Sequence, residues 1–153
     1  MRAYFFGNMY LSSIQQGIQA AHCTAEMYMR YHSGTGKIQN CRAGLYNWAA
    51  HYKTMVLLNG GDTNSLYDIW EHCDSGDNPY AWAYFEEAGV RKALTCVGII
   101  LPERIYSDDT RYYVRSENRK DRMARIEYKF KTPELTDWEW MMVEFLSGCG
   151  LAR

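Results

Sequence analysis

The sequence predicts an α/β fold, a three-layer domain in which a four-stranded mixed sheet is flanked by helices. Within the first 102 residues, apolar segments alternate with segments of helical periodicity in the order strand–helix–strand–helix–strand–strand. The link between the third and fourth strands has no helical pattern, so we expect antiparallel as well as parallel neighbours. The 153 residues, 47 % of them hydrophobic, are enough for one domain with a sizeable core.

The N-terminal part begins with a short buried strand and a long helix. The aromatic run over residues 3–6 is typical of a strand, and a Gly-Asn pair ends it. Two serines at residues 12–13 are candidate caps for a helix that continues to residue 31. Its apolar residues recur at helical spacing at Ile14, Ile18, Ala21 and Ala25.

The middle of the chain supplies the next strand between two helices. We expect a loop over residues 33–37, a shorter helix over residues 43–51 and a strand over residues 54–58. Asp62 or Thr63 is the expected N-cap of a third helix. The apolar face of that helix carries Leu66, Ile69 and Trp70.

Two further strands and a helix complete the pattern. A turn over residues 74–79 leads to the third strand, over residues 80–85, and a proline ends the fourth strand, over residues 95–101. The Thr-Asp-Trp-Glu sequence at residues 136–139 is a capping box, and it opens a helix that a glycine at position 148 ends.

We expect a single domain over residues 1–153, composed of three parts. These are a core (1–105), a basic insertion (106–131) and a C-terminal helix (132–153). The insertion carries eight Arg and Lys residues against five acidic ones.

The basic insertion has the pattern of a β-hairpin with arms at residues 111–115 and 125–130. One interpretation is a solvated hairpin whose charges oppose aggregation at a sheet edge. The other is an anion-binding addition to a ligand pocket. Arg111 and Arg115 lie on one face of the first arm, with two tyrosines between them, and such residues bind phosphates and stack on bases.

The C-terminal helix is rich in large apolar residues, which favour packing in the core or between two copies of the chain. A homodimer is therefore expected. These residues are Trp138, Trp140, Met141, Met142 and Phe145.

Composition and charge exclude several classes of protein. The 17 basic and 18 acidic residues nearly balance, which excludes a polyanion-coating protein. No apolar run approaches the roughly 20 residues that span a bilayer, and no signal-peptide pattern follows Met1, so we expect a cytoplasmic protein without membrane contact.

The common catalytic and metal-binding motifs are absent from the sequence. The five cysteines are dispersed without a CxxC pair, which favours reduced core residues, and we expect neither a metal nor a cofactor. The GTGK sequence at residues 34–37 lacks the spacing and the following Ser or Thr of a Walker motif. No G-x-S-x-G sequence marks a serine nucleophile.

One face of the first helix is rich in polar side chains. Gln15, Gln19 and His22 follow i, i+4, i+7 spacing and therefore share a face. A solvated face more commonly carries Lys and Glu. This face can hydrogen-bond a ligand or make structural contacts with the sheet, and the pattern leaves both open.

The stretch LSSIQQGIQAAHCTA over residues 11–25 resembles the first helix of the type-2 peptidyl-tRNA hydrolases, the archaeal and eukaryotic class. Their motif runs approximately G-K-x-A-A-Q-x-x-H-A directly after an N-terminal strand. Gln19 and His22 stand where that motif has its glutamine and histidine. The resemblance implies a peptidyl-tRNA-hydrolase-like fold over about residues 1–105.

Three later features follow in the order of that family. Trp48 precedes the second strand, the Glu-Glu-Ala-Gly sequence at residues 86–89 resembles a D-A-G element, and residues 95–102 resemble the closing strand.

The chain departs from the family at positions that matter for chemistry. Gln15 replaces the lysine of the motif, Glu87 falls at or near its aspartate, and Val90-Arg91 replaces an Arg-Thr pair. Thr95 is matched to a family threonine across a segment that is shorter here. Loss of the lysine removes a positive charge that could hold a tRNA phosphate or polarise an ester.

The function expected from these features is binding of a nucleotide-containing small molecule. Small proteins that resemble this family are frequent in phage genomes, so one concrete role is anti-defence in the host cytoplasm. There the protein would sequester a nucleotide immune signal such as a cyclic ADP-ribose isomer or a cyclic dinucleotide. The expected ligand-binding residues are Gln15, Gln19, His22, Glu87, Arg91, Thr95, Arg111 and Arg115.

Two alternatives stay open. In a divergent peptidyl-tRNA hydrolase, Glu87, Thr95 and His22 would orient a water towards the ester, and the acceptor end of tRNA would be the partner. In a protein–protein interaction module, the aromatic C-terminal helix would be the docking face.

Overall fold

The computed structural model describes residues 1–107 and 135–152. It divides into two compact units, one comprising Met1–Leu101 with Cys149–Arg153 and the other comprising Pro102–Gly148. The single-domain organisation expected from the sequence stays a prediction.

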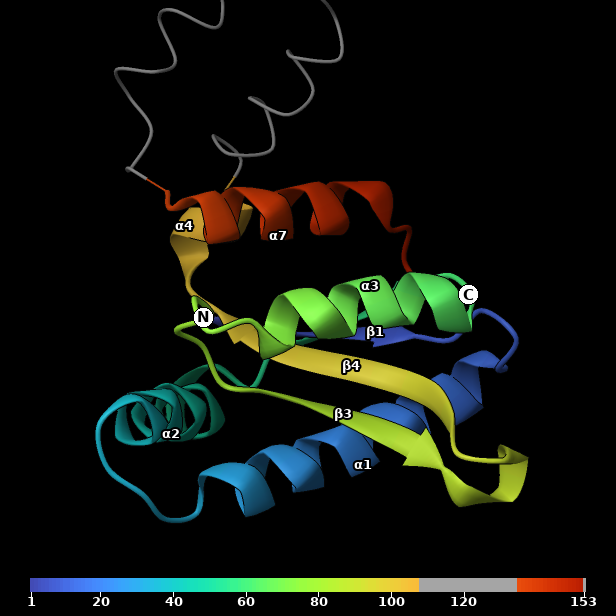
Figure 1. Cartoon of the computed structure of the whole chain (residues 1–153), viewed down its shortest axis with the longest axis horizontal. Helices are drawn as coiled ribbons and strands as arrows, with labels where there is room; N and C mark the ends of the chain where they lie inside the picture. The colour runs from blue at the N-terminus through green and yellow to red at the C-terminus, as the bar shows by residue number, and fades with distance from the viewer. Residues whose placement is uncertain (108–134, 153) are drawn as a thin grey trace, which may run out of the picture. The chain divides into compact units, whose positions relative to one another are not determined.

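The first unit is built on a four-stranded sheet. Its strands are β1 (Arg2–Gly7), β2 (Met55–Asn59), β3 (Trp82–Glu87) and β4 (Ala93–Leu101), in the order β2-β1-β4-β3 (Figure 1). β1 is parallel to β2, whereas β4 is antiparallel to both β1 and β3. The predicted mixed sheet of four strands is confirmed.

Helices cover both faces of this sheet, as the sequence predicts for a three-layer fold. α1 (Ser13–Tyr31) and α2 (Lys37–Asn47) lie on one face, and α3 (Thr63–Asp74) lies on the other (Figure 1). The buried core on the side of α1 and α2 includes Phe5, Met27, Leu45, Trp48, Cys96 and Ile100.

α1 has the predicted bounds but buries a different face. The predicted apolar repeat is largely exposed, with Ile14 77 % and Ile18 48 % accessible. The core face instead carries Gln16, Gln19, Ala20, Cys23, Met27 and Tyr31. Each of the two buried glutamines donates a hydrogen bond through its side-chain nitrogen, which offsets part of the cost of removing the amide from water. The Gln16 Oε1 atom is buried and has no hydrogen-bond partner among the described residues.

The second helix begins earlier than predicted. α2 starts directly after Gly36, whose φ of 60° is a left-handed conformation that glycine adopts readily. The predicted start of this helix, residue 43, was wrong. Gly36, which we expected in a loop, is the N-cap, and the helix begins at Lys37. After α2 the chain continues as a π-helical turn, Trp48–Tyr52, closed by the Lys53 N–H on its first carbonyl at 2.9 Å.

The third helix is capped as predicted. The Asp62 carboxylate accepts from the Ser65 N–H at 2.9 Å, so the first of the two candidate caps is the one used. Leu66 and Ile69 are buried, and Trp70 is half-buried.

The second unit contains α4 (Glu103–Tyr106) and α7 (Asp137–Gly148). The predicted capping box is confirmed, because Thr136 N–H donates to Glu139 Oε2 at 3.0 Å and Glu139 N–H donates to Thr136 Oγ1 at 3.2 Å. The buried Glu139 carboxylate also pairs with the guanidinium of Arg104, which links the two helices. Trp138, Met142 and Val143 are buried, whereas Met141 is 48 % exposed.

All five cysteines are free, and four of them are buried. Burial raises the pKa of the Cys73 thiol, which therefore stays protonated at neutral pH. None of the helices within residues 1–107 and 135–152 is both long and apolar enough to cross a bilayer.

Candidate functional site

The candidate site lies where the first half of α1 meets the ends of two strands. Gln19 projects from α1, Glu87 is the last residue of β3, and Thr95 lies near the start of β4. The β3–β4 pairing has an irregularity between Phe85 and Glu86, so the strand end that carries Glu87 is displaced from regular register.

Gln19 joins the other two side chains. It is only 6 % exposed, and its Nε2 donates to Glu87 Oε2 at 3.0 Å. Its Oε1 lies 3.1 Å from the Thr95 hydroxyl, which also lies 3.0 Å from the Phe85 carbonyl. Because both ends of the amide are engaged, its orientation is fixed, and the carboxylate of Glu87 is held in one place.

The Glu87 carboxylate is held in its ionised form. Its second oxygen accepts from the Gly89 N–H at 3.4 Å, at the start of the short 3₁₀ turn Ala88–Val90. The hydrogen bond from Gln19, then that from Gly89, and the charge of nearby His22 hold the pKa of Glu87 below its ordinary value, against a smaller effect of burial. At neutral pH this group accepts hydrogen bonds and does not donate a proton.

This lowered pKa predicts a pH-dependent contribution to stability. The folded protein favours ionised Glu87, so the stabilisation is fully present above the ordinary pKa of 4.5 and is lost as the pH falls through the lower folded value. Chemical denaturation measures the free energy of unfolding of the wild type and of Glu87→Gln from about pH 7 to about pH 3. The wild type should be the more stable protein, and its advantage should shrink only at the acidic end of this range. A difference that is constant across this range would contradict the assignment.

His22 lies beside the same site on the exposed surface of α1. Its ring meets that of Phe85 edge to face, with ring centroids 4.5 Å apart. The contact with Phe85 gives the imidazole a preferred orientation, and the residue as a whole stays exposed.

Asn8 is a structural member of the site that the sequence reading did not include. It is buried, its backbone N–H donates to the Thr95 carbonyl at 3.0 Å, and its side-chain amide donates to Leu94 and Thr63. Asn8 therefore ties the end of β1 to the start of β4 and positions Thr95. The sequence did contain a signal for this role, since Asn8 directly follows a strand predicted to be buried. A buried polar side chain at such a position is normally hydrogen-bonded.

The other expected ligand residues are placed differently. Gln15 is exposed and forms the capping box of α1, in which its Oε1 accepts from the Ser12 N–H at 3.0 Å. Arg91 lies in the β3–β4 loop with a φ of 56°, exposed and next to the equally exposed Lys92. Arg111 and Arg115 lie outside the described residues.

The structure thus brings Gln19, Glu87 and Thr95 into one hydrogen-bonded chain, with His22 beside it. Whether these residues bind a ligand stays a prediction. Within the described ranges, no group of three or more His, Cys, Asp or Glu residues is placed to hold a metal ion.

No protein-family model matches the chain, and no curated protein is significantly similar to it. The resemblance to the type-2 peptidyl-tRNA hydrolases therefore rests on the motif residues given above.

Proposed function

We propose that this protein binds a nucleotide-containing small molecule and holds it intact, with Glu87 as the principal acceptor. The observation that carries the proposal is the fixed, ionised carboxylate of Glu87, held by the buried Gln19 amide and by Gly89. A carboxylate in this state is suited to accept from the adjacent hydroxyls of a ribose, the role that acidic residues have in dinucleotide sites.

The surroundings supply the other contacts that a nucleotide requires. Arg91 and Lys92 are exposed cations four and five positions after Glu87 and are candidates for the phosphates. The His22 ring, packed on Phe85, offers an aromatic surface for a base.

Holding the ligand without cleaving it agrees with the chemistry of the first helix. The amide of Gln15 stands where the resembling family has a lysine, and it is engaged in the helix cap. The site therefore lacks a cation at this position to stabilise the charge that develops when an ester is cleaved. As a finer proposal, the protein is a phage product that sequesters a nucleotide immune signal in the host cytoplasm, such as a cyclic ADP-ribose isomer or a cyclic dinucleotide.

Mass spectrometry of freshly purified protein, under native and then denaturing conditions, tests this proposal directly. We expect an intact nucleotide to be released on denaturation, or one compound from a panel of cyclic nucleotides and ADP-ribose derivatives to bind. In calorimetric titration, Glu87→Gln should weaken binding by at least about tenfold, or about 1.4 kcal/mol. Glu71→Gln, an exposed change of the same kind on α3, is the matched control. Failure of every nucleotide in the panel to bind at high micromolar concentration would overturn the proposal.

A divergent peptidyl-tRNA hydrolase is the second candidate function. It is favoured by the grouping of an ionised carboxylate, a threonine and a histidine, which could orient a water towards the ester of peptidyl-tRNA. Turnover of peptidyl-tRNA that is lost in Glu87→Gln and His22→Ala would support this function over ligand retention. Turnover that persists in both variants would place the chemistry elsewhere.

A further inference from the structure

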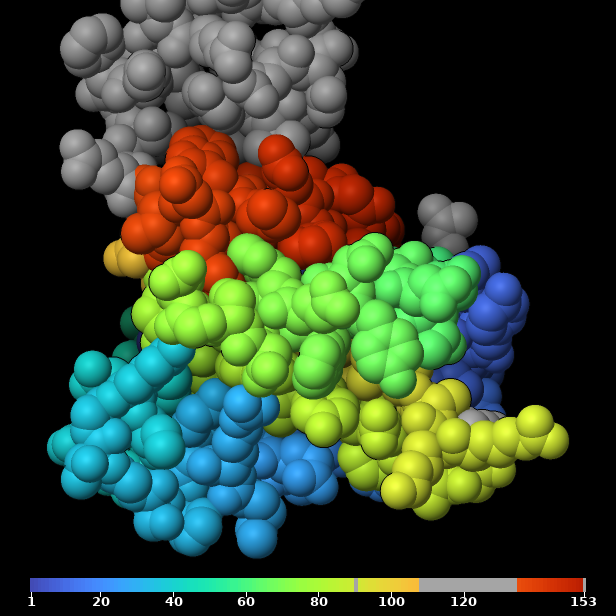
Figure 2. All heavy atoms as spheres, in the orientation of Figure 1, coloured from blue at the N-terminus to red at the C-terminus, as the bar shows by residue number. Residues whose placement is uncertain are grey.

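The two edges of the sheet differ in their backbone hydrogen bonding. The outer edge of β2 is paired with the C-terminal residues, since Asn59 N–H donates to the Gly150 carbonyl at 2.8 Å and Ala152 N–H donates to the Leu57 carbonyl at 3.0 Å. β3 forms the other edge. In Figure 2 atoms of β3 reach the surface between α3 and α1.

The backbone of β3 is partly unpaired along this edge. Trp82 N–H points away from β4 and donates to the Tyr31 hydroxyl at 3.3 Å. Because backbone directions alternate in an antiparallel pair, Tyr84 presents its N–H and C=O to the same open side. Among the described residues no hydrogen bond from beyond the sheet reaches the Tyr84 backbone, and its side chain is 37 % exposed.

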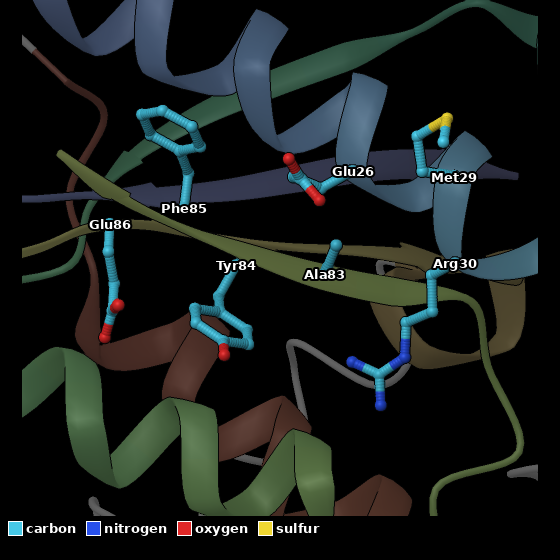
Figure 3. Close-up of a pocket in the computed structure, with 7 residues that line it drawn as sticks. All are labelled: Glu26, Met29, Arg30, Ala83, Tyr84, Phe85 and Glu86. Atoms are coloured by element: carbon cyan, nitrogen blue, oxygen red, sulfur yellow. The ribbon is translucent and has the colours of Figure 1, made fainter. Parts of the chain in front are cut away.

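A groove of about 550 Å³ follows this edge (Figure 3). Glu26 and Met29 line it from α1, together with Ala83 and Phe85, which face the same side of the strand. The Tyr84 ring and the Glu86 carboxylate extend to the α3 side of the strand (Figure 3). The groove therefore has a recess over Ala83 on one side of β3, which is apolar apart from the Glu26 carboxylate at its α1 wall, and an aromatic, acidic wall on the other side.

The charges of the groove favour a cationic occupant. Arg30 is engaged at one end, with its guanidinium 4.1 Å from the Trp82 ring centroid and 3.6 Å from the Asp74 carboxylate. Among the described residues no cation forms an ion pair with Glu26 or Glu86, so within that part of the chain these two carboxylates are the uncompensated charges of the lining. Beside Glu86, the Tyr84 ring packs edge to face on Trp70, with centroids 5.9 Å apart, and presents an aromatic surface that attracts cations.

We propose that the edge of β3 binds an extended peptide segment of a partner protein by strand addition, with apolar and basic residues alternating along the peptide. The peptide pairs with the Tyr84 backbone as a fifth strand. Successive side chains of a strand point to opposite faces, so every second residue enters the recess over Ala83, and the residues between them place Lys or Arg against Tyr84 and Glu86. This pairing does not require the nucleotide proposed at Glu87.

Fluorescence anisotropy with a short labelled peptide of alternating Val and Lys tests this proposal on the full chain. We expect saturable binding that is at least about tenfold tighter than that of the matching Val–Glu peptide. Glu86→Lys should weaken binding of the Val–Lys peptide by about tenfold or more, whereas Asp77→Asn, an exposed change in the preceding turn, should not. On binding, hydrogen exchange of the Tyr84 amide should slow.

A second probe separates strand addition from simple charge attraction without changing the protein. The Val–Lys peptide with an N-methyl group on every residue keeps its charges but has no main-chain N–H to donate to β3, and it should not bind. Equal binding of the methylated peptide, or equal binding of the Val–Glu peptide, would overturn the proposal. So would a failure of the Val–Lys peptide to bind, including the case in which the edge is occupied by a second copy. If a second copy occupies the edge, sedimentation should show a dimer. Tyr84→Pro should dissociate this dimer, because proline at this position removes only the backbone N–H that points away from β4.

Discussion

Replacing Phe5 by alanine is expected to lower the free energy of unfolding by about 3–5 kcal/mol. Phe5 lies in the central strand β1 and is 1 % exposed, in the core beneath α1. Opposite it stands Gly98, where an added Cβ would lie 2.8 Å from both the Phe5 ring and the Met27 methyl group. The ring therefore fills space that the opposing residue leaves empty, and its removal creates a cavity that the rigid sheet cannot close.

Urea denaturation followed by circular dichroism measures this loss. Tyr10→Ala is the control, because that aromatic side chain is 78 % exposed and should change the free energy of unfolding by under about 0.5 kcal/mol. A Phe5→Ala protein within about 1 kcal/mol of the wild type would contradict the packing of β1 against α1.

The sheet could be predicted because its strands carry strong local signals. The aromatic run of β1 and the apolar runs of β2 and β4 are typical of β-strands, and a glycine, asparagine or proline lies at the end of each run. The observed strands begin or end one or two residues away from the predicted bounds, since pairing with neighbours decides where a ladder stops.

The buried face of α1 could not be predicted from hydropathy. Its periodic isoleucines, Ile14 and Ile18, face solvent, while Gln16 and Gln19 face the sheet. For Gln19, burial is made possible by hydrogen bonds to Glu87 and Thr95, which are far away in the sequence, whereas Gln16 donates to the nearby Leu11 carbonyl. Side-chain burial that depends on such long-range partners leaves no periodic signal.

The candidate site could be predicted in part, by the resemblance and not by spacing. Gln19, Glu87 and Thr95 are separated by up to 76 positions, and the structure places them in one chain of hydrogen bonds. The role of Gln15 was missed although a local signal was present, because Ser12 and Gln15 have the S-x-x-Q spacing of a capping box.

Replacing Gln19 by leucine should separate the function of the site from the stability of the fold. Leucine is close to glutamine in size, and the Thr95 hydroxyl keeps the Phe85 carbonyl as its acceptor at 3.0 Å. Glu87 is half-buried and can take a water in place of the amide. Because no buried donor is left without a partner, the free energy of unfolding should fall by only about 1 kcal/mol.

The effect of Gln19→Leu on the site should be much larger. Without the amide, the strongest cause of the lowered pKa of Glu87 is removed, so this pKa should rise towards its ordinary value. The freed carboxylate loses its fixed position, and affinity for the nucleotide identified by mass spectrometry should fall by about 10- to 100-fold, or about 1.4–2.8 kcal/mol. NMR titration of the Glu87 side chain and calorimetry measure the two effects independently.

Gln16→Leu is the matched control, because the same substitution is made three residues earlier on the same helix face. Gln16 is buried, and its side-chain amide donates to the Leu11 carbonyl at 3.0 Å, at the start of the helix. Among the described residues its side chain makes no hydrogen bond to Glu87. That variant should leave both the pKa of Glu87 and the affinity for the nucleotide unchanged. If the two variants alter these quantities equally, Gln19 acts through the packing of α1 and not through its hydrogen bond to the carboxylate.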